Sequence, residues 1–155
     1  MRLNVILDQP EIPGNTGSLI RLAAAVGFEL HIAGPTLFEF TDTRLKRAGL
    51  DYHDLAVMTE HQSLDAAYAA LRPRRVFAFT GEAAAHHTDI EYQDGDALLF
   101  GRESTGLDEH VKHDPRVTEL VRIPMRPGIR SLNLANSASV VVYEAWRQHG
   151  FDGAV

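Results

Sequence analysis

The sequence predicts an α/β domain in which a mostly parallel sheet is covered by helices on both faces, and three observations lead to this prediction. Short apolar runs alternate along the chain with longer segments whose apolar residues recur at helical spacing. Several of the short runs are apolar at every position, which is typical of parallel strands buried on both faces. The chain has 155 residues, enough for a single core, so we expect residues 1–155 to form one domain.

The first half of the chain is expected to contain three strands and three helices. Apolar residues on one face of the first helix run as far as Val26, and Gly27 ends it. Asn15 or Thr16 is expected to cap its N-terminus, because short polar side chains accept hydrogen bonds from the free N–H groups there. The strands are expected at residues 3–7, 30–33 and 55–58, and the helices at 18–26, 43–48 and 64–71.

The second half is expected to end in a strand, a turn and a long helix. Pro124 cannot donate to a sheet ladder, and the pair Pro127-Gly128 favours a turn. Ser131 and Asn133 flank the start of the last helix and are candidates to cap it. The strands are expected at residues 76–79, 96–100 and 117–123, and the helices at 107–113 and 132–148.

Composition excludes several classes of protein. The chain has no cysteine, which excludes disulfides and thiolate chemistry and is typical of a cytoplasmic protein. No apolar run approaches the ~20 residues of a membrane-spanning helix. The net charge of −6 does not favour non-specific nucleic-acid binding, but 13 of the 15 basic residues are arginines, and they cluster. Such clusters predict a local contact with phosphate groups.

Motif comparison excludes further activities. The segment GRESTGL, residues 101–107, lacks the lysine of a phosphate-binding P-loop and the Gly-x-Ser-x-Gly order of a hydrolase elbow. The chain contains no G-x-G-x-x-G dinucleotide fingerprint. His86-His87 and the pair His110 and His113 have no further ligands at a recurring spacing, so no metal site is expected.

Polar residues concentrate in three segments that follow expected strands: PEIPGNTGSLIR, FGRESTGL and IPMRPGIRSLNLANSASV. The third segment and the residue before it contribute Arg122, Arg126 and Arg130, with no acidic residue among them. Loops between strands and helices are where α/β proteins bind ligands, because helix N-termini offer unpaired donors. The alternative for the third segment is a capped core helix behind a turn that carries arginines.

In order and spacing, the three segments resemble the three motifs of the SPOUT superfamily of trefoil-knotted RNA methyltransferases. The resemblance covers nearly the whole chain, and the third motif is highly specific. Further segments, including RAGLDYH, YQDGD and VVVYEAWRQ, are similar to the small bacterial tRNA (cytidine/uridine) 2′-O-methyltransferases that act on the wobble nucleotide. The resemblance implies a C-terminal deep knot, S-adenosylmethionine as cofactor, tRNA as substrate and a homodimer packed through the first and last helices.

The resemblance also implies site residues. The backbone of the three knot loops would hold the adenosine of the cofactor at Phe79, Gly101, Ile123, Ser131 and Leu132. Five side chains would surround the reacting ribose: Asn15, Arg21, Glu103, Ser131 and Asn133.

Arg21 has two interpretations. Helical geometry places it opposite the apolar face of its helix, which is typical of a solvated surface residue. As a functional residue it would bind a phosphate or stabilise the developing alkoxide, because an arginine does not readily accept a proton. A phosphate oxygen or water would then take the proton of the 2′-hydroxyl.

Two alternatives to tRNA methylation stay open at this point. One is a 2′-O-methyltransferase that acts on rRNA, and the other is a non-catalytic dimer that binds S-adenosylmethionine or RNA. A dimer is expected independently, because the last helix carries more apolar surface than one small domain is expected to cover. The residues concerned are Leu134, Ala138, Val141, Val142, Ala145 and Trp146.

Overall fold

A computed structural model describes residues 1–39, 47, 49 and 57–155. The helix expected at residues 43–48 lies outside the described residues except for Arg47, and so do residues 55 and 56 of the third expected strand. The basic residues Arg44 and Lys46 belong to the same undescribed stretch.

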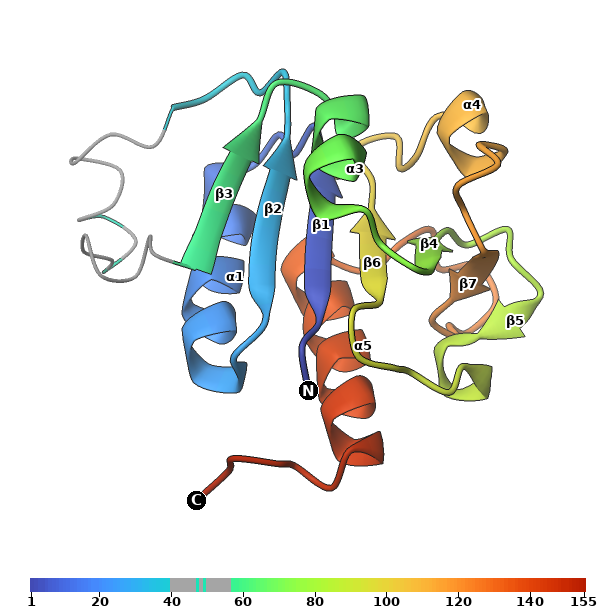
Figure 1. The fold of residues 1–155 in the computed structure, drawn as a ribbon. Helices are drawn as coiled ribbons and strands as arrows, with labels where there is room; N and C mark the ends of the chain where they lie inside the picture. Colours follow the sequence, from blue (N-terminus) through green and yellow to red (C-terminus); the bar gives the residue numbers. More distant parts are fainter. Residues whose placement is uncertain (40–46, 48, 50–56) are drawn as a thin grey trace.

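Within the described residues, seven strands form one sheet in the order β3-β2-β1-β6-β4-β7-β5 (Figure 1). Every neighbouring pair is parallel, which confirms the predicted fold class. The strands are β1 (Asn4–Asp8), β2 (Glu29–Ala33), β3 (Met58–His61), β4 (Val76–Phe79), β5 (Ala85–His86), β6 (Ala97–Phe100) and β7 (Glu119–Arg122). The helices are α1 (Pro13–Val26), α3 (Leu64–Leu71), α4 (Glu109–Lys112) and α5 (Leu134–Gln148), with a 3-10 turn at His87–Asp89.

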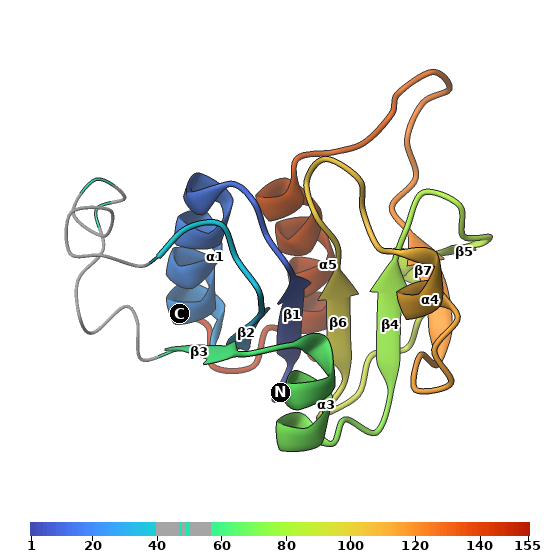
Figure 2. The ribbon, with the colours of Figure 1, turned by 90° about the horizontal axis from the view of Figure 1, so that it is seen from above.

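Both faces of the sheet are covered, as Figure 2 shows: α1 and α5 lie side by side on one face, and α3 and α4 lie on the other. Alternation along the strands explains the two layers. In β1, Val5 and Leu7 belong to the core cluster under α1 and α5, whereas Ile6 belongs to the cluster under α3 and α4. Because both faces are buried, the strands contain few polar positions, which is why they could be recognised as continuous apolar runs.

The ends of the long helices partly match the prediction. Asn133 caps α5, and its side chain accepts a hydrogen bond from the Asn136 N–H at 3.1 Å. The expected caps of α1 are wrong, because the helix begins earlier. Pro13 occupies its first turn, where a missing N–H group does no harm, and Ile12 is the N-cap. Asn15 and Thr16 therefore lie inside the first turn, and both are buried.

The apolar residues of α5 are covered more completely than expected. Leu134, Ala138, Val141, Val142 and Ala145 are all buried within the chain itself, so they are not the reason for a dimer. The apolar side chains that α5 leaves exposed are Val140 and Tyr143. The trefoil knot that the resemblance implies stays a prediction.

Two differences concern short elements. The helix expected at residues 107–113 is the single turn α4, because Leu107 is drawn into the core and Asp108 is the N-cap. The strand β5 was not predicted at all. It has two residues and lies at the sheet edge beside β7, too short to produce an alternating pattern.

The loop that follows β6 folds back tightly on itself. Arg102 and Gly106 exchange backbone hydrogen bonds, with the Gly106 N–H donating at 2.9 Å and the Arg102 N–H at 3.3 Å. Gly106 has a φ of +71°, which favours glycine. A Cβ atom on Gly101 would lie 2.3 Å from both the Gly106 carbonyl carbon and the Leu107 nitrogen. Only glycine therefore fits at residue 101 without moving the backbone.

Gly101→Ala is expected to destabilise the protein, because the added methyl group meets backbone atoms that cannot rotate away. We expect the free energy of unfolding, measured in urea, to fall by at least ~2 kcal/mol. Gly81→Ala is the matched control: Gly81 lines the same cavity, but a Cβ atom there has nothing within 4 Å. An equal effect of the two substitutions would contradict the account of this loop.

Candidate functional site

Four parallel strands end at one edge of the sheet, and a cavity lies beside these ends. The strand order changes direction at the pair β1 and β6: β1 is followed outward by β2 and β3 on one side, and β6 by β4 and β7 on the other. Such a switch point is where open α/β sheets bind ligands. The cavity has a volume of about 830 Å³ and is lined by the loops after β1, β4, β6 and β7.

The cavity gathers eight of the nine site residues expected from the sequence. These residues come from α1, from the end of β4 and from the loops after β6 and β7, so the fold brings together segments far apart in the sequence. They are Asn15, Phe79, Gly101, Glu103, Ile123, Ser131, Leu132 and Asn133.

Two glutamates tie the loop after β6 to the beginning of α1. The Glu103 carboxylate accepts hydrogen bonds from the backbone N–H of Glu11, at 2.9 and 3.2 Å, and from the N–H of Ile12. In return, the Glu11 carboxylate accepts from the Ser104 N–H at 3.0 Å and from the Ser104 hydroxyl at 2.6 Å. Those two hydrogen bonds lower the pKa of Glu11. The two glutamates fix one wall of the cavity. The carboxylate of Glu103 is therefore already hydrogen-bonded to the backbone.

Two asparagines join the first turns of α1 and α5. The side-chain amide of Asn133 donates to the side-chain Oδ1 atom of Asn15 at 2.9 Å. Asn15 is 7% exposed, so its side chain is held where it meets the cavity. Asn133 also caps α5, so it fixes both the start of this helix and the position of the Asn15 side chain.

Two aromatic rings contribute to the apolar part of the lining. Phe79 and Phe100 stack with their centroids 4.7 Å apart and their planes 10° apart. They lie at the ends of β4 and β6, which are separated by one strand spacing because these strands pair. The stacked pair gives the cavity a flat, buried apolar surface next to the Gly101 backbone.

Basic side chains also line the cavity. The Lys112 ammonium contacts the carboxylates of Glu109 at 2.6 Å and Glu82 at 2.8 Å, and these contacts raise the pKa of Lys112. Arg102 pairs with Asp108 at 2.8 Å, which braces the loop after β6. Arg122 also lines the cavity, and sequence reasoning gave it no separate role. The one sequence feature that pointed to Arg122 was its place in a cluster of arginines.

A buried carboxyl group lies beneath this loop. Asp8 ends β1 and is 5% exposed. Burial raises the pKa of Asp8, and the nearby Arg102 guanidinium partly opposes that rise. Asp8 therefore places a polar group at the end of β1, on the face of the sheet that α3 and α4 cover.

Arg21 is the expected site residue that does not line the cavity. It follows Asn15 by six residues on α1, so at ~100° per residue the two side chains point in directions about 120° apart. Its guanidinium is exposed and donates to the Gly49 carbonyl oxygen at 3.3 Å. One copy of the chain therefore does not bring Arg21 to the other site residues.

The described residues contain neither a metal-binding cluster nor a membrane-spanning helix. In the described ranges, no group of three or more His, Cys, Asp or Glu side chains is placed to hold a metal ion. Among the described helices, none is both long and apolar enough to cross a membrane.

Comparison with known proteins gives a consistent result. The model of the SpoU rRNA methylase family matches residues 2–143. A tRNA (cytidine(34)-2′-O)-methyltransferase of Methylovorus glucosotrophus is 51% identical over 152 residues, which cover 98% of this chain and 99% of the relative.

Solved structures agree with the observed fold. A structure described as giving insights into the 2-OH methylation of C/U34 on tRNA has a TM-score of 0.87 and 44% identity, and the match covers 97% of each chain. The SpoU methyltransferase AviRb of Streptomyces viridochromogenes, in complex with the cofactor AdoMet, has a TM-score of 0.78 and 28% identity, covering 96% of this chain and 60% of AviRb. With its fold, its cavity and a family match over most of its length, the chain belongs to the SpoU rRNA methylase family.

Proposed function

We propose that this chain is a methyltransferase that uses S-adenosylmethionine to methylate the 2′-hydroxyl of nucleotide 34, the wobble position of tRNA. The observation that carries the proposal is the cavity, in which eight expected site residues from four separated segments meet. The substrate is inferred from the relative that shares 51% of its residues over nearly the full length of both chains and is named for this reaction. We treat residues 1–155 as one catalytic domain and place the enzyme in the cytoplasm with its substrate.

The cavity fits the cofactor in size and chemistry. Its volume of about 830 Å³ is within the range of small-molecule sites. The stacked rings of Phe79 and Phe100 suit an adenine base, and Gly101, the residue after Phe100, also lines the cavity. The backbone at Ile123 and Leu132 would complete the adenosine site. A bound S-adenosylmethionine supplies an electrophilic methyl group.

The residues of the chain would then act by positioning. Methyl transfer requires the ribose 2′-oxygen to be held in line and to lose its proton. Asn15, Ser131 and Asn133 lie at the cavity and offer hydrogen-bonding groups for the ribose. Glu103 acts indirectly in this scheme, because its carboxylate holds the start of α1. Arg21 would bind a phosphate or stabilise the alkoxide, and water or a phosphate oxygen would take the proton.

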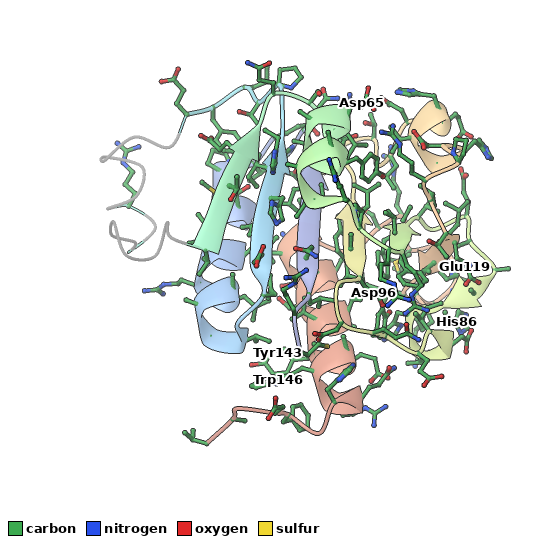
Figure 3. All side chains as sticks on the ribbon, viewed as in Figure 1. Asp65, His86, Asp96, Glu119, Tyr143 and Trp146 are labelled. Carbon is green, nitrogen blue, oxygen red and sulfur yellow. The ribbon has the colours of Figure 1, made fainter. Side chains whose placement is uncertain are left out.

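We propose that the enzyme is a homodimer and that Arg21 serves the cavity of the partner. The support is twofold: Arg21 does not reach the cavity of its own chain, and the outer surface of the α1 and α5 layer carries exposed apolar residues. On α5, Val140 is 42% and Tyr143 is 46% exposed, and Tyr143 packs edge-on against Trp146 (Figure 3). Exposed apolar side chains on the outer side of a helix such as α5 are typical of an interface between subunits.

The proposed function predicts the product of the reaction. Purified protein incubated with labelled S-adenosylmethionine and total tRNA should transfer label to the 2′-oxygen of nucleotide 34, as mapped by nuclease digestion and mass spectrometry. Ribosomal RNA is offered in parallel, because the family description mentions rRNA. Label in rRNA alone would favour that alternative. Cofactor binding with no transfer to either RNA would favour the non-catalytic dimer.

Mixed dimers test the role of Arg21. Arg21→Lys keeps the charge but loses the planar fork, so we expect methylation to fall by at least ~10²-fold with cofactor affinity unchanged. The second variant is Ser131→Trp. Ser131 lines the cavity and is exposed, so a tryptophan there should block the cavity and abolish activity. If Arg21 acts on the partner, mixing the two variants regenerates one complete site in each mixed dimer, and activity returns to roughly a quarter of wild type.

Two outcomes would count against this assignment. Near-normal turnover of Arg21→Lys would show that Arg21 is a solvated surface residue. An inactive mixture, in which mass spectrometry under native conditions detects the mixed dimers, would show that Arg21 does not act across the interface.

A further inference from the structure

Arg122 is a cation inside the cavity for which the described residues provide no partner. It is the last residue of β7, and its side chain lines the cavity next to the proposed adenosine site at Ile123. Its Nε atom is buried and has no hydrogen-bond partner. Val121, the preceding residue, is fully buried in the core, so the strand holds Arg122 firmly in place.

Other arginines in the described ranges show how this chain normally treats a guanidinium. Arg75 pairs with Asp96 at 2.6 Å, Arg116 with Asp65 at 2.6 Å, and Arg147 with Glu144 at 2.9 Å. Arg126 and Arg130, on the loop after β7, are exposed to water. Arg122 differs from both groups, because it is partly enclosed and has no carboxylate from the described residues.

The two acidic residues that line the cavity, Glu82 and Glu103, do not change this balance. Glu82 contacts the ammonium of Lys112 at 2.8 Å, and the Glu103 carboxylate accepts hydrogen bonds from the backbone N–H groups of Glu11 and Ile12. A partly buried charge without a partner costs free energy, and a ligand that supplies the partner recovers it. The geometry therefore favours an oxyanion in the cavity at Arg122.

Two oxyanions are available to an enzyme of the proposed function: the carboxylate of the amino-acid tail of the cofactor, and a phosphate of RNA. A guanidinium fork binds either one through two hydrogen bonds. Position decides between them. Arg122 is enclosed and adjoins the loops proposed to hold adenosine, whereas Arg130 is exposed at the cavity rim, where an RNA backbone has room.

We propose that Arg122 binds the carboxylate of the amino-acid tail of S-adenosylmethionine. The assignment rests on the proposed function, because it needs the cofactor to occupy this cavity. It adds a charged side-chain contact to a site otherwise built from backbone groups and two aromatic rings. It also gives the cavity a direction: the adenine at the stacked rings of Phe79 and Phe100, and the amino-acid tail toward β7.

The test compares two ligands that differ in the tail. S-Adenosylhomocysteine carries the carboxylate, and 5′-methylthioadenosine lacks the whole amino-acid group. Isothermal titration of full-length protein should show that Arg122→Gln weakens S-adenosylhomocysteine about 10-fold to 100-fold, the usual range for a lost charge-assisted hydrogen bond. Affinity for 5′-methylthioadenosine should stay within about threefold of wild type, which also shows that the variant is folded. The affinity of Arg122→Lys for S-adenosylhomocysteine should lie between those of the wild type and Arg122→Gln, because lysine keeps the charge and loses the planar fork.

A charge-matched control removes an exposed arginine of the loop that follows β7. Arg126→Gln, outside the cavity lining, should leave the affinity for both ligands unchanged. Equal weakening of both ligands by Arg122→Gln would overturn the proposal, since the residue would then shape the cavity. Unchanged binding of S-adenosylhomocysteine with weakened binding of tRNA would assign Arg122 to an RNA phosphate instead. Failure of the wild-type protein to bind S-adenosylhomocysteine would overturn the proposed function itself.

Discussion

The parallel alignment of β1, β6, β4 and β7 is the constraint on which the site depends. Because parallel strands end at the same edge, the segments that follow them meet there, although they are far apart in the sequence. The loops still need to be fixed to each other. The paired glutamates Glu11 and Glu103 do this between α1 and the loop after β6, and Asn15 and Asn133 do it between α1 and α5. The cavity is thus a product of sheet direction and of four polar side chains.

Much of the fold could be predicted from the sequence, because burial on both faces makes the central strands β4 and β6 apolar throughout. The strand at Val76–Phe79 and the helix at Leu64–Leu71 have the predicted bounds. The start of α1 could not be predicted in the same way. Pro13 begins the helix without a side-chain cap, and Asn15, a good cap by residue type, is used instead to contact Asn133. The tertiary contact decided its role, and local propensity did not.

The sequence predicted which residues gather at the cavity, but it did not predict which groups each side chain contacts. Eight of the nine expected residues line the cavity, and their motifs carried that information. What the motifs did not carry is the partner of each side chain. Glu103 was expected near the ribose, and the structure shows its carboxylate engaged by two backbone N–H groups. Arg21 was expected in the same place and lies elsewhere on the surface of its own chain. Arg122 drew notice only as one of a cluster, since enclosure cannot be read from a sequence.

The distribution of charge on this acidic chain is compatible with the nucleic-acid substrate that we propose. The net charge is −6, yet acidic residues in the described ranges are largely paired or used in local structure, as Asp96, Asp108 and Glu144 are. Arg126 and Arg130, which are exposed beside the cavity, have no ion-pair partner among the described residues. The field near the cavity mouth can therefore differ in sign from that of the whole molecule.

The central claim is that the loops after β4, β6 and β7 form the cofactor site, and a crystal structure of the protein with S-adenosylhomocysteine tests it most directly. The account predicts density for the adenosine beside Phe79, Gly101 and Leu132, in contact with backbone groups of all three loops. Density for the ligand at any other place on the chain, with this cavity unchanged from the ligand-free protein, would contradict it.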